Sequence, residues 1–133
     1  MEKVKVVVRY SCGRLIKGFT QDFFPNKKLF HLTVVDHPSG KPIEVSIEDL
    51  KAIFMVGDFG GRPLYQERKK YIEGEKPSGR KVEVTFIDGE VLVGSNLGYD
   101  LKRQGFFIFP ADPKSNNIRV YVVSSFVEKV RYL

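Results

Sequence analysis

The residue types that most often carry catalysis are scarce in this 133-residue sequence. His31 and His37 are the only histidines, and Cys12 is the only cysteine. His31 falls within a predicted strand and His37 precedes a proline, a placement that favours neither a metal-ligand pair nor a Ser-His-Asp arrangement. A single cysteine excludes an intramolecular disulfide and a cysteine-based zinc site. We therefore expect no catalytic residues, no metal and no cofactor.

One short motif matches a fragment of a known signature without the remainder, and other signatures are absent. Asp58-Phe59-Gly60 spells the metal-binding tripeptide of protein kinases, but no His-Arg-Asp catalytic loop is present, and no Gly-Lys-Ser or Gly-Lys-Thr follows to form a phosphate loop. Glu48-Asp49 fits the start of a helical turn better than acid–base work. The Arg-x-x-x-Arg arm and Asp/Asn-x-Ser-x-x-Gly strand motif of PilZ domains, which bind cyclic dinucleotides, are both absent.

Positive charge is concentrated between the two halves of the chain. The formal net charge is +6, and residues 62–81 carry seven basic against three acidic side chains, 7 − 3 = +4. Such a cluster attracts phosphates, and nearby tyrosines can stack on bases; a solvated linker is the alternative interpretation. The candidate binding residues in or near this cluster are Arg62, Tyr65, Arg68, Lys69, Lys70, Tyr71, Arg80, Lys81 and Tyr99.

A polar loop in the second half supplies the remaining candidates. It follows the aromatic run 106–109, and its candidate binding residues are Asp112, Lys114, Asn116 and Asn117. The competing interpretation, which we favour, is an Asx-type turn whose side chains bond their own backbone. Phe106 and Phe107 are consecutive in a predicted strand and must point to opposite faces. We expect one of them to pack at a seam between the two halves, together with 54–56 and Phe59.

The elements that must position these residues repeat along the chain. Residues 6–20 and 82–96 share alternating apolar positions, a turn glycine and a second glycine five residues later. Both pairs of glycines are 76 residues apart, since 89 − 13 = 76 and 94 − 18 = 76. The second glycine lies inside a returning strand and predicts a sharp bend, as small barrels require. The four glycines are Gly13, Gly18, Gly89 and Gly94.

Further strands complete each copy. In the first half we predict strands at 3–10, 14–20, 29–35, 43–47 and 51–56, with a helical turn at 48–50. The second half repeats the hairpin at 82–96 and adds strands at 105–109, 118–123 and 127–133, with a helical turn at 124–126. A short helix is predicted at 64–72. The domains are expected at 1–56 and 80–133, joined by a connector at 57–79.

Five strands with a helical turn before the last resemble Sm-like and SH3-like small barrels. The pattern of Val84, Phe86, Asp88-Gly89, Leu92 and Gly94 is similar to the first Sm motif, although the Asp and Asn of the Sm nucleotide pocket have no counterparts. This resemblance implies an all-β fold of two tandem five-stranded barrels from an internal duplication.

Nearly the whole chain also resembles an uncharacterised bacterial domain found alone or attached to signalling proteins. The stretches LKAIFMVGDFG at 50–60 and GFFIFPADPKSNN at 105–117 carry this likeness. It implies a regulatory or adaptor module and supplies no catalytic residues.

We accordingly expect a non-enzymatic binding module for a protein partner, engaged through exposed strand edges. RNA or single-stranded nucleic acid is the alternative ligand. No apolar run is long enough to span a membrane and no signal peptide is visible, so a cytoplasmic location is expected. The abundance of Val, Lys and Glu is typical of proteins from hot habitats. The sequence does not indicate an oligomeric state.

Overall fold

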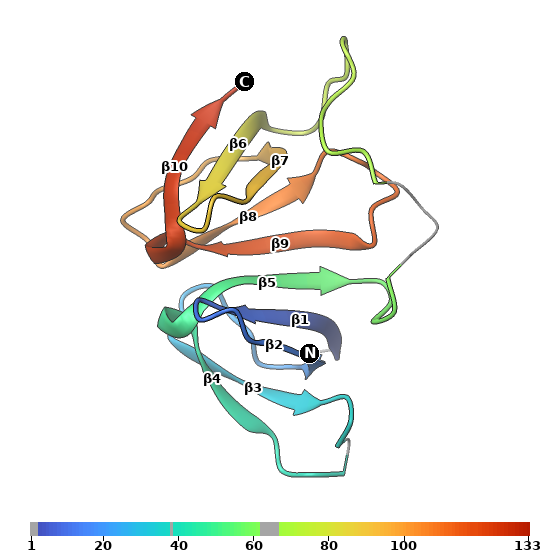
Figure 1. The fold of residues 1–133 in the computed structure, drawn as a ribbon, viewed down its shortest axis with the longest axis vertical. Helices are drawn as coiled ribbons and strands as arrows, with labels where there is room; N and C mark the ends of the chain where they lie inside the picture. The colour runs from blue at the N-terminus through green and yellow to red at the C-terminus, as the bar shows by residue number, and fades with distance from the viewer. Residues whose placement is uncertain (1–2, 38, 62–66) are drawn as a thin grey trace.

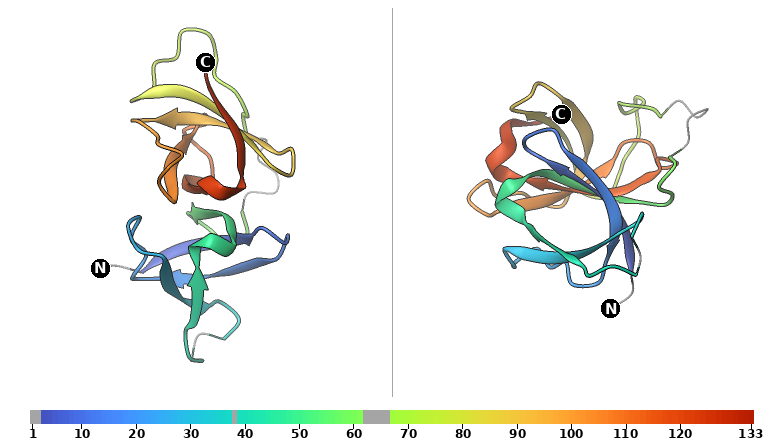
Figure 2. Two further views of the ribbon diagram at one scale, coloured as in Figure 1. Left: turned by 90° about the vertical axis from the view of Figure 1, so that its left-hand side faces the viewer. Right: turned by 60° about the horizontal axis from the view of Figure 1, so that its bottom comes forward.

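The chain folds into one ten-stranded antiparallel sheet with the strand order β10-β6-β7-β8-β9-β5-β1-β2-β3-β4. This computed structural model describes residues 3–37, 39–61 and 67–133. Figures 1 and 2 show the first five strands curled below the last five. The strands are β1 Val4–Tyr10, β2 Leu15–Thr20, β3 Leu29–Val34, β4 Ile43–Ser46, β5 Leu50–Val56, β6 Arg80–Phe86, β7 Val91–Asn96, β8 Gly105–Pro110, β9 Asn117–Val123 and β10 Val127–Tyr132. Two 3-10 turns, η1 Ile47–Asp49 and η2 Ser124–Phe126, precede β5 and β10.

The all-β class predicted from the sequence is confirmed, and so are the two helical turns. The prediction of two tandem five-stranded barrels is not confirmed. β5 pairs with both β1 and β9, so a single sheet runs through residues 3–56, the N-terminal half, and residues 80–133, the C-terminal half. The sheet is open, because β4 and β10 each have one sheet neighbour among the described residues.

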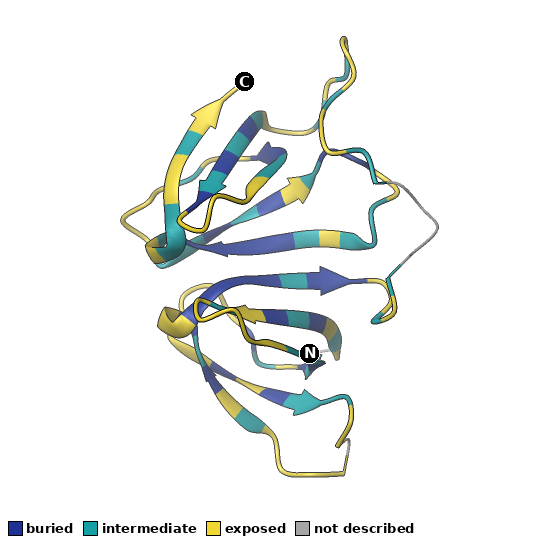
Figure 3. Cartoon of the chain, in the orientation of Figure 1, coloured by how far each residue is buried: buried dark blue, intermediate teal, exposed yellow. Residues whose placement is uncertain are grey.

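The two central strands are buried on both faces. Along β5, Ile53 and Met55 enter the core of the N-terminal half, while Ala52 belongs to the core of the C-terminal half and Phe54 packs against it. Figure 3 shows β5 and the adjoining end of β9 as the most continuously buried strands. Because successive side chains of a strand point to opposite faces, each of these strands supplies both cores at once.

Strand β9 alternates in the same way. Tyr121 and Val123 enter the N-terminal core, and Val120 and Val122 enter the C-terminal core. On β8, Phe106 belongs to the C-terminal core, whereas Phe107 packs against the N-terminal core. The expected seam position of one of these two phenylalanines is therefore confirmed.

Glycines at equivalent points of β2 and β7 allow the sheet to bend. Gly94 pairs with β6 on one side and β8 on the other. A Cβ added at Gly94 would lie 2.3 Å from the carbonyl oxygen of Phe109, and one at Gly18 would lie 2.4 Å from that of Thr33. Only a residue without a side chain permits so close an approach of two strands, and this explains the glycine inside each strand.

The described part of the connector contains no helix, contrary to the prediction for 64–72. Residues 67–72 form none, and 64–66 lie outside the described residues. The backbone N–H of Arg68 donates to the Asp112 carboxylate at 2.9 Å, and that of Ile72 donates to Glu75 at 2.6 Å. Side chains thus take the donors that a continuing helix would use. No helix among the described residues has the length and apolar character needed to cross a membrane.

We predict that Gly94→Ala lowers the free energy of unfolding by about 2 kcal/mol, because the added methyl meets a backbone oxygen that cannot rotate away. Gly60→Ala is the control: the nearest atom to its new Cβ is 3.9 Å away and its φ is not left-handed. This variant should stay within about 0.5 kcal/mol of the parent protein. Urea denaturation followed by circular dichroism measures both, and equal midpoints for the two variants would refute the close-packing explanation.

Candidate functional site

Two apolar cavities adjoin along β7, β8 and the connector. Their volumes are about 480 and 520 Å³, and both are lined by Leu97 and Phe109. We call the combined depression the apolar groove. The connector side is formed by Tyr71, Pro77 and Pro113, among others, and the opposite side by Tyr99, Phe106, Phe107 and Tyr121.

The two residues shared by the cavities are unusually exposed for their type. Leu97 is 81% exposed and Phe109 is 41% exposed. β7 and β8 pair only at Gly94↔Pro110 and Ser95↔Phe109, so the chain after Asn96 leaves the sheet and carries Leu97 into solvent. Exposed apolar side chains grouped around cavities mark binding surfaces more often than isolated ones do.

Aromatic and basic residues continue from the groove across the C-terminal half. The rings of Phe106 and Tyr99 are 5.6 Å apart, and those of Tyr99 and Tyr132 are 5.5 Å apart. The guanidinium of Arg80 lies 3.6 Å from the centre of the Tyr132 ring. We call these four side chains the aromatic ladder. It brings together two predicted candidates, Arg80 and Tyr99, that are far apart in sequence.

Arg68 fastens the connector to the polar loop. Its guanidinium donates to both carboxylate oxygens of Glu75, one at 2.9 Å, and to the carbonyl oxygen of Ala111 at 3.2 Å. The pKa of Glu75 is held below its ordinary value, chiefly by these hydrogen bonds from Arg68. Arg68 therefore has a structural role in holding residues 67–75 against the sheet.

The other basic candidates are placed differently. Lys69 is largely exposed and lies 3.8 Å from the Glu67 carboxylate, and Lys70 is exposed. Lys81 lies over the Tyr71 ring at 5.0 Å. Burial raises the pKa of the Tyr71 hydroxyl, which faces Ser95 at the wall of the groove. Arg62 and Tyr65 lie outside the described residues.

The polar loop forms the predicted Asx-type turn. The buried Asp112 carboxylate accepts from the backbone N–H of Lys114 at 2.8 Å. The Asn116 side chain accepts from the N–H of Asp58 and donates to its carbonyl oxygen, each at 2.9 Å. Asn117 begins β9 and donates its N–H to Ser115 Oγ at 3.0 Å. These four candidates are thus arranged around internal contacts, and Asn116 ties the end of β5 to the start of β9.

A salt bridge that the sequence patterns did not indicate joins the two halves. Lys51, on β5, is buried and donates to Asp88 at 2.7 Å and to Glu90, both in the β6–β7 hairpin. Its ammonium also lies 4.8 Å from the centre of the Phe86 ring. The sequence did contain one indication of this salt bridge, a single lysine inside the apolar run 50–56. A lysine side chain in a strand that is buried on both faces requires a partner of opposite charge.

The electrostatics of this salt bridge favour the charged forms. Burial alone would lower the pKa of Lys51, but its hydrogen bonds to Asp88 and Glu90 outweigh burial and the pKa lies above its ordinary value. The pKa of Asp88 is held below its ordinary value of 3.8, mainly by the hydrogen bond from Lys51.

His31 and Asp22 form the nearest approach to an acid–base pair. The ring Nδ1 lies 2.6 Å from the Asp22 carboxylate, which also accepts the His31 backbone N–H at 2.8 Å. Burial raises the pKa of Asp22, but these hydrogen bonds outweigh it and the pKa lies below its ordinary value. Both side chains are about half exposed. The described residues hold no cluster of three or more potential metal ligands.

Comparison with known proteins identifies the family. A model of a family of unknown function, DUF6982, matches residues 2–133, and the chain therefore belongs to this family. No curated protein and no solved structure matches the chain.

We predict that Lys51→Met reduces the loss of stability in acid. In the parent protein the lowered pKa of Asp88 contributes stability that is complete above 3.8 and is lost as the pH falls through the lowered value. Without Lys51 the carboxyl regains a nearly ordinary pKa, so the free energy of unfolding should fall less steeply between about pH 5 and pH 2.

Lys129→Met is the matched control, because it removes the same charge from β10, where the described residues give it no ion pair. Urea denaturation across the pH range measures all three proteins. Parallel pH profiles for the Lys51 variant and the parent would show that the salt bridge does not contribute to acid sensitivity.

Proposed function

We propose that this chain is a non-enzymatic binding module that engages a protein partner through the apolar groove. The observation that carries the proposal is the pair of adjoining cavities, centred on the exposed side chains of Leu97 and Phe109. Their volumes fall within the range of ligand sites, and their walls are mostly apolar and aromatic with few charges. This chemistry fits an extended peptide segment with apolar side chains, one for each cavity.

The sheet edges are less suited to a partner than the groove is. On β4 the edge carries Glu44 and begins directly after Pro42, which has no N–H to donate. On β10 the edge carries Lys129 and Arg131. Charges and proline on an edge strand oppose the addition of another strand. We therefore place the partner in the groove and not, as the sequence had led us to expect, on an exposed edge.

We also propose that the two halves are related five-stranded units of the Sm-like or SH3-like kind, derived from one ancestral unit. Three comparisons support this. Within each half the strand order is the same, β5-β1-β2-β3-β4 and β10-β6-β7-β8-β9. The first three strands of the two halves start 76 residues apart, as 80 − 4, 91 − 15 and 105 − 29 show. The 3-10 turns and last strands start 77 apart, as 124 − 47 and 127 − 50 show.

A second candidate ligand is single-stranded nucleic acid. The aromatic ladder favours it, because stacked rings beside a guanidinium resemble the surfaces on which bases stack. Lys69 and Lys70 would then contact phosphates from the exposed connector. Against this, Arg80 already occupies one face of the Tyr132 ring.

We predict that peptides selected from a random display library on the immobilised protein carry apolar side chains. The substitution Leu97→Asp in the protein should weaken their binding at least tenfold, which is about 1.4 kcal/mol or more of binding free energy. The new carboxylate would be desolvated by the bound peptide without a partner. The matched control is Ile118→Asp, which changes a residue 62% exposed on β9 that does not line the groove. Isothermal titration with a selected peptide measures both. Failure to select binders, or equal loss in both variants, would refute the groove proposal.

The nucleic-acid candidate makes a different prediction. If the net charge of +4 over residues 62–81 engages four phosphates, a fourfold rise in salt should weaken binding of single-stranded RNA about fiftyfold. Fluorescence anisotropy with a labelled RNA at two salt concentrations measures this. Absence of binding at the lower salt concentration would eliminate nucleic acid as the ligand.

A further inference from the structure

Another cavity, unlike the groove in chemistry, lies where the two halves meet beside the 3-10 turns. Figures 1 and 2 show η1 and η2 one above the other on the same side of the molecule. The cavity has a volume of about 460 Å³, and we call it the seam pocket. Its walls come from Lys28 and 46–48 of the N-terminal half and from 101–104 and 123–125 of the C-terminal half.

The seam pocket has an excess of positive charge. Lys28, Lys102 and Arg103 line it, against the single carboxylate of Glu48, which leaves 3 − 1 = +2. None of the three cations has an ion-pair partner among the described residues, whereas Lys51 has two. Cations that line one cavity from both halves without an ion-pair partner create a positive potential that attracts an anion.

Hydroxyl groups supply hydrogen-bond donors at the same place. Ser46, Ser124 and Ser125 line the seam pocket. The Ser124 hydroxyl oxygen is buried and has no hydrogen-bond partner among the described residues. Buried polar groups nearly always have a partner, and leaving one unpaired costs about 1–3 kcal/mol. Because Ser124 is only half-buried and lines the pocket, a rotation about its χ1 bond would let an acceptor oxygen in the pocket satisfy this hydroxyl.

The walls of the pocket are fixed to each other across the seam. Gln104 Nε2 donates to the carbonyl oxygens of Pro25 and Lys27 at 2.7 and 2.6 Å. The backbone N–H of Ser124 donates to the Gln104 carbonyl at 2.9 Å, and that of Ile47 donates to the Lys28 carbonyl at 2.9 Å. These hydrogen bonds fix the walls of the cavity, and such preorganisation reduces the entropic cost of binding.

We propose that the seam pocket binds a small phosphate ester. A phosphate monoester has three acceptor oxygens and a charge of about −1.5 to −2 near neutral pH, which matches the +2 excess and the serine donors. Ile47, Leu101 and Val123 form an apolar wall for the organic part of the ester. Binding depends on both halves together, so the ligand also stabilises their association. This site differs from the peptide groove in its ligand, and Arg103 is the one described residue that lines both.

Isothermal titration of the full chain with adenosine 5′-monophosphate, inorganic phosphate and adenosine, at constant ionic strength, tests the proposal. We expect the monophosphate to bind with one site per chain, inorganic phosphate to compete with it more weakly, and adenosine not to bind. Equal affinity for adenosine, or no heat from either phosphate at millimolar concentration, would overturn the proposal. If inorganic phosphate binds as tightly as the monophosphate, the role of the apolar wall would be refuted.

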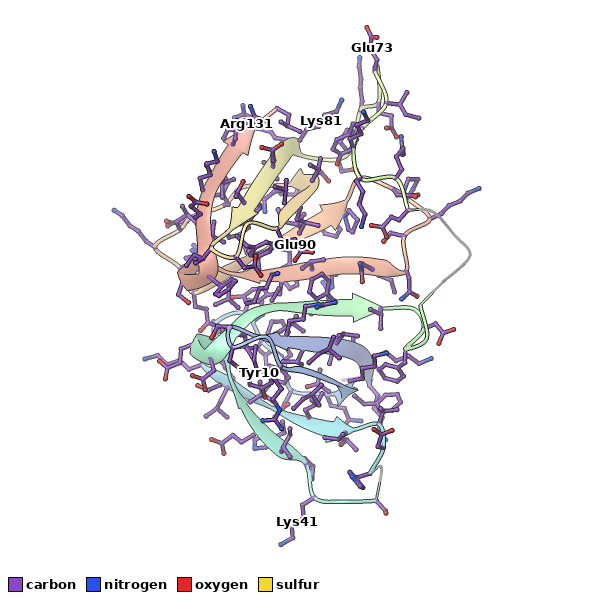
Figure 4. All side chains as sticks on the ribbon, viewed as in Figure 1. Tyr10, Lys41, Glu73, Lys81, Glu90 and Arg131 are labelled. Atoms are coloured by element: carbon purple, nitrogen blue, oxygen red, sulfur yellow. The ribbon has the colours of Figure 1, made fainter. Side chains whose placement is uncertain are left out.

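Two variants at residues outside the groove distinguish binding at the seam pocket from a general attraction of anions to a basic protein. Lys28→Gln should weaken the monophosphate at least tenfold, whereas Lys41→Gln, at the remote end of the N-terminal half (Figure 4), should not. Ser124→Ala removes no charge, yet it should weaken binding about fivefold because a donor is lost.

The ligand-free Ser124→Ala protein should melt at the same temperature as the parent or higher, since the unpaired hydroxyl is gone. An affinity for the monophosphate equal to that of the parent would refute the site. Because Ser124 and Lys28 do not line the groove, these results are independent of the peptide experiment.

Discussion

The antiparallel ladder between β5 and β9 is the interaction on which the rest of the structure depends. Its register, Ala52↔Val122 through Met55↔Arg119, joins strands that are more than sixty residues apart. The apolar side chains of these strands divide alternately between two cores, so neither half could complete its core if the ladder opened. A half of about fifty residues buries too little surface to be more than marginally stable alone. The Lys51 salt bridge and the Gln104 hydrogen bonds add further contacts between the halves.

The groove and the seam pocket both depend on the loop between β7 and β8. The loop after β7 leaves the sheet at Asn96, exposes Leu97 to form the groove, and then returns at Gln104 to contact the N-terminal half. The connector is held against the loop after β8 by the hydrogen bonds from Arg68 to Ala111 and Asp112, and its Pro77 contributes to the other wall of the groove. One loop thus contributes to an apolar surface at one end and to a polar pocket at the other. A conformational change in this loop would affect both.

Local patterns in the sequence were sufficient for the strands and insufficient for their arrangement. Alternating apolar residues and turn glycines predicted the ten strands, and Gly94 marked a true close approach. The helix predicted at 64–72 failed in its described part because carboxylates of Asp112 and Glu75 take backbone donors there, one of them from far away in sequence. The continuity of the sheet was missed because a continuous apolar strand shows that both faces are buried but not which strand lies beside it. The groove was missed because Leu97 and Phe109 are isolated apolar residues in the sequence and become neighbours only when β7 and β8 pair.

The different side chains at corresponding positions of the two halves explain why the sheet stops at ten strands. β10 occupies the position in the C-terminal half that β5 occupies in the N-terminal half. At a spacing of 77 residues, however, the apolar Ala52 and Phe54 of β5 correspond to the charged Lys129 and Arg131 of β10. Val120 and Tyr121 of β9 correspond in the same way to Ile43 and Glu44 of β4, which follows Pro42. Figure 3 shows the resulting exposure of β10, and on β4 the side chain of Glu44 is exposed. An apolar β10 edge would present the same surface that β5 presents to β9, and chains would add to one another without closure. Charge at the two edges therefore confines the ladder to the interior of one chain, and this is why both proposed binding sites, the groove and the seam pocket, consist of side chains rather than strand edges.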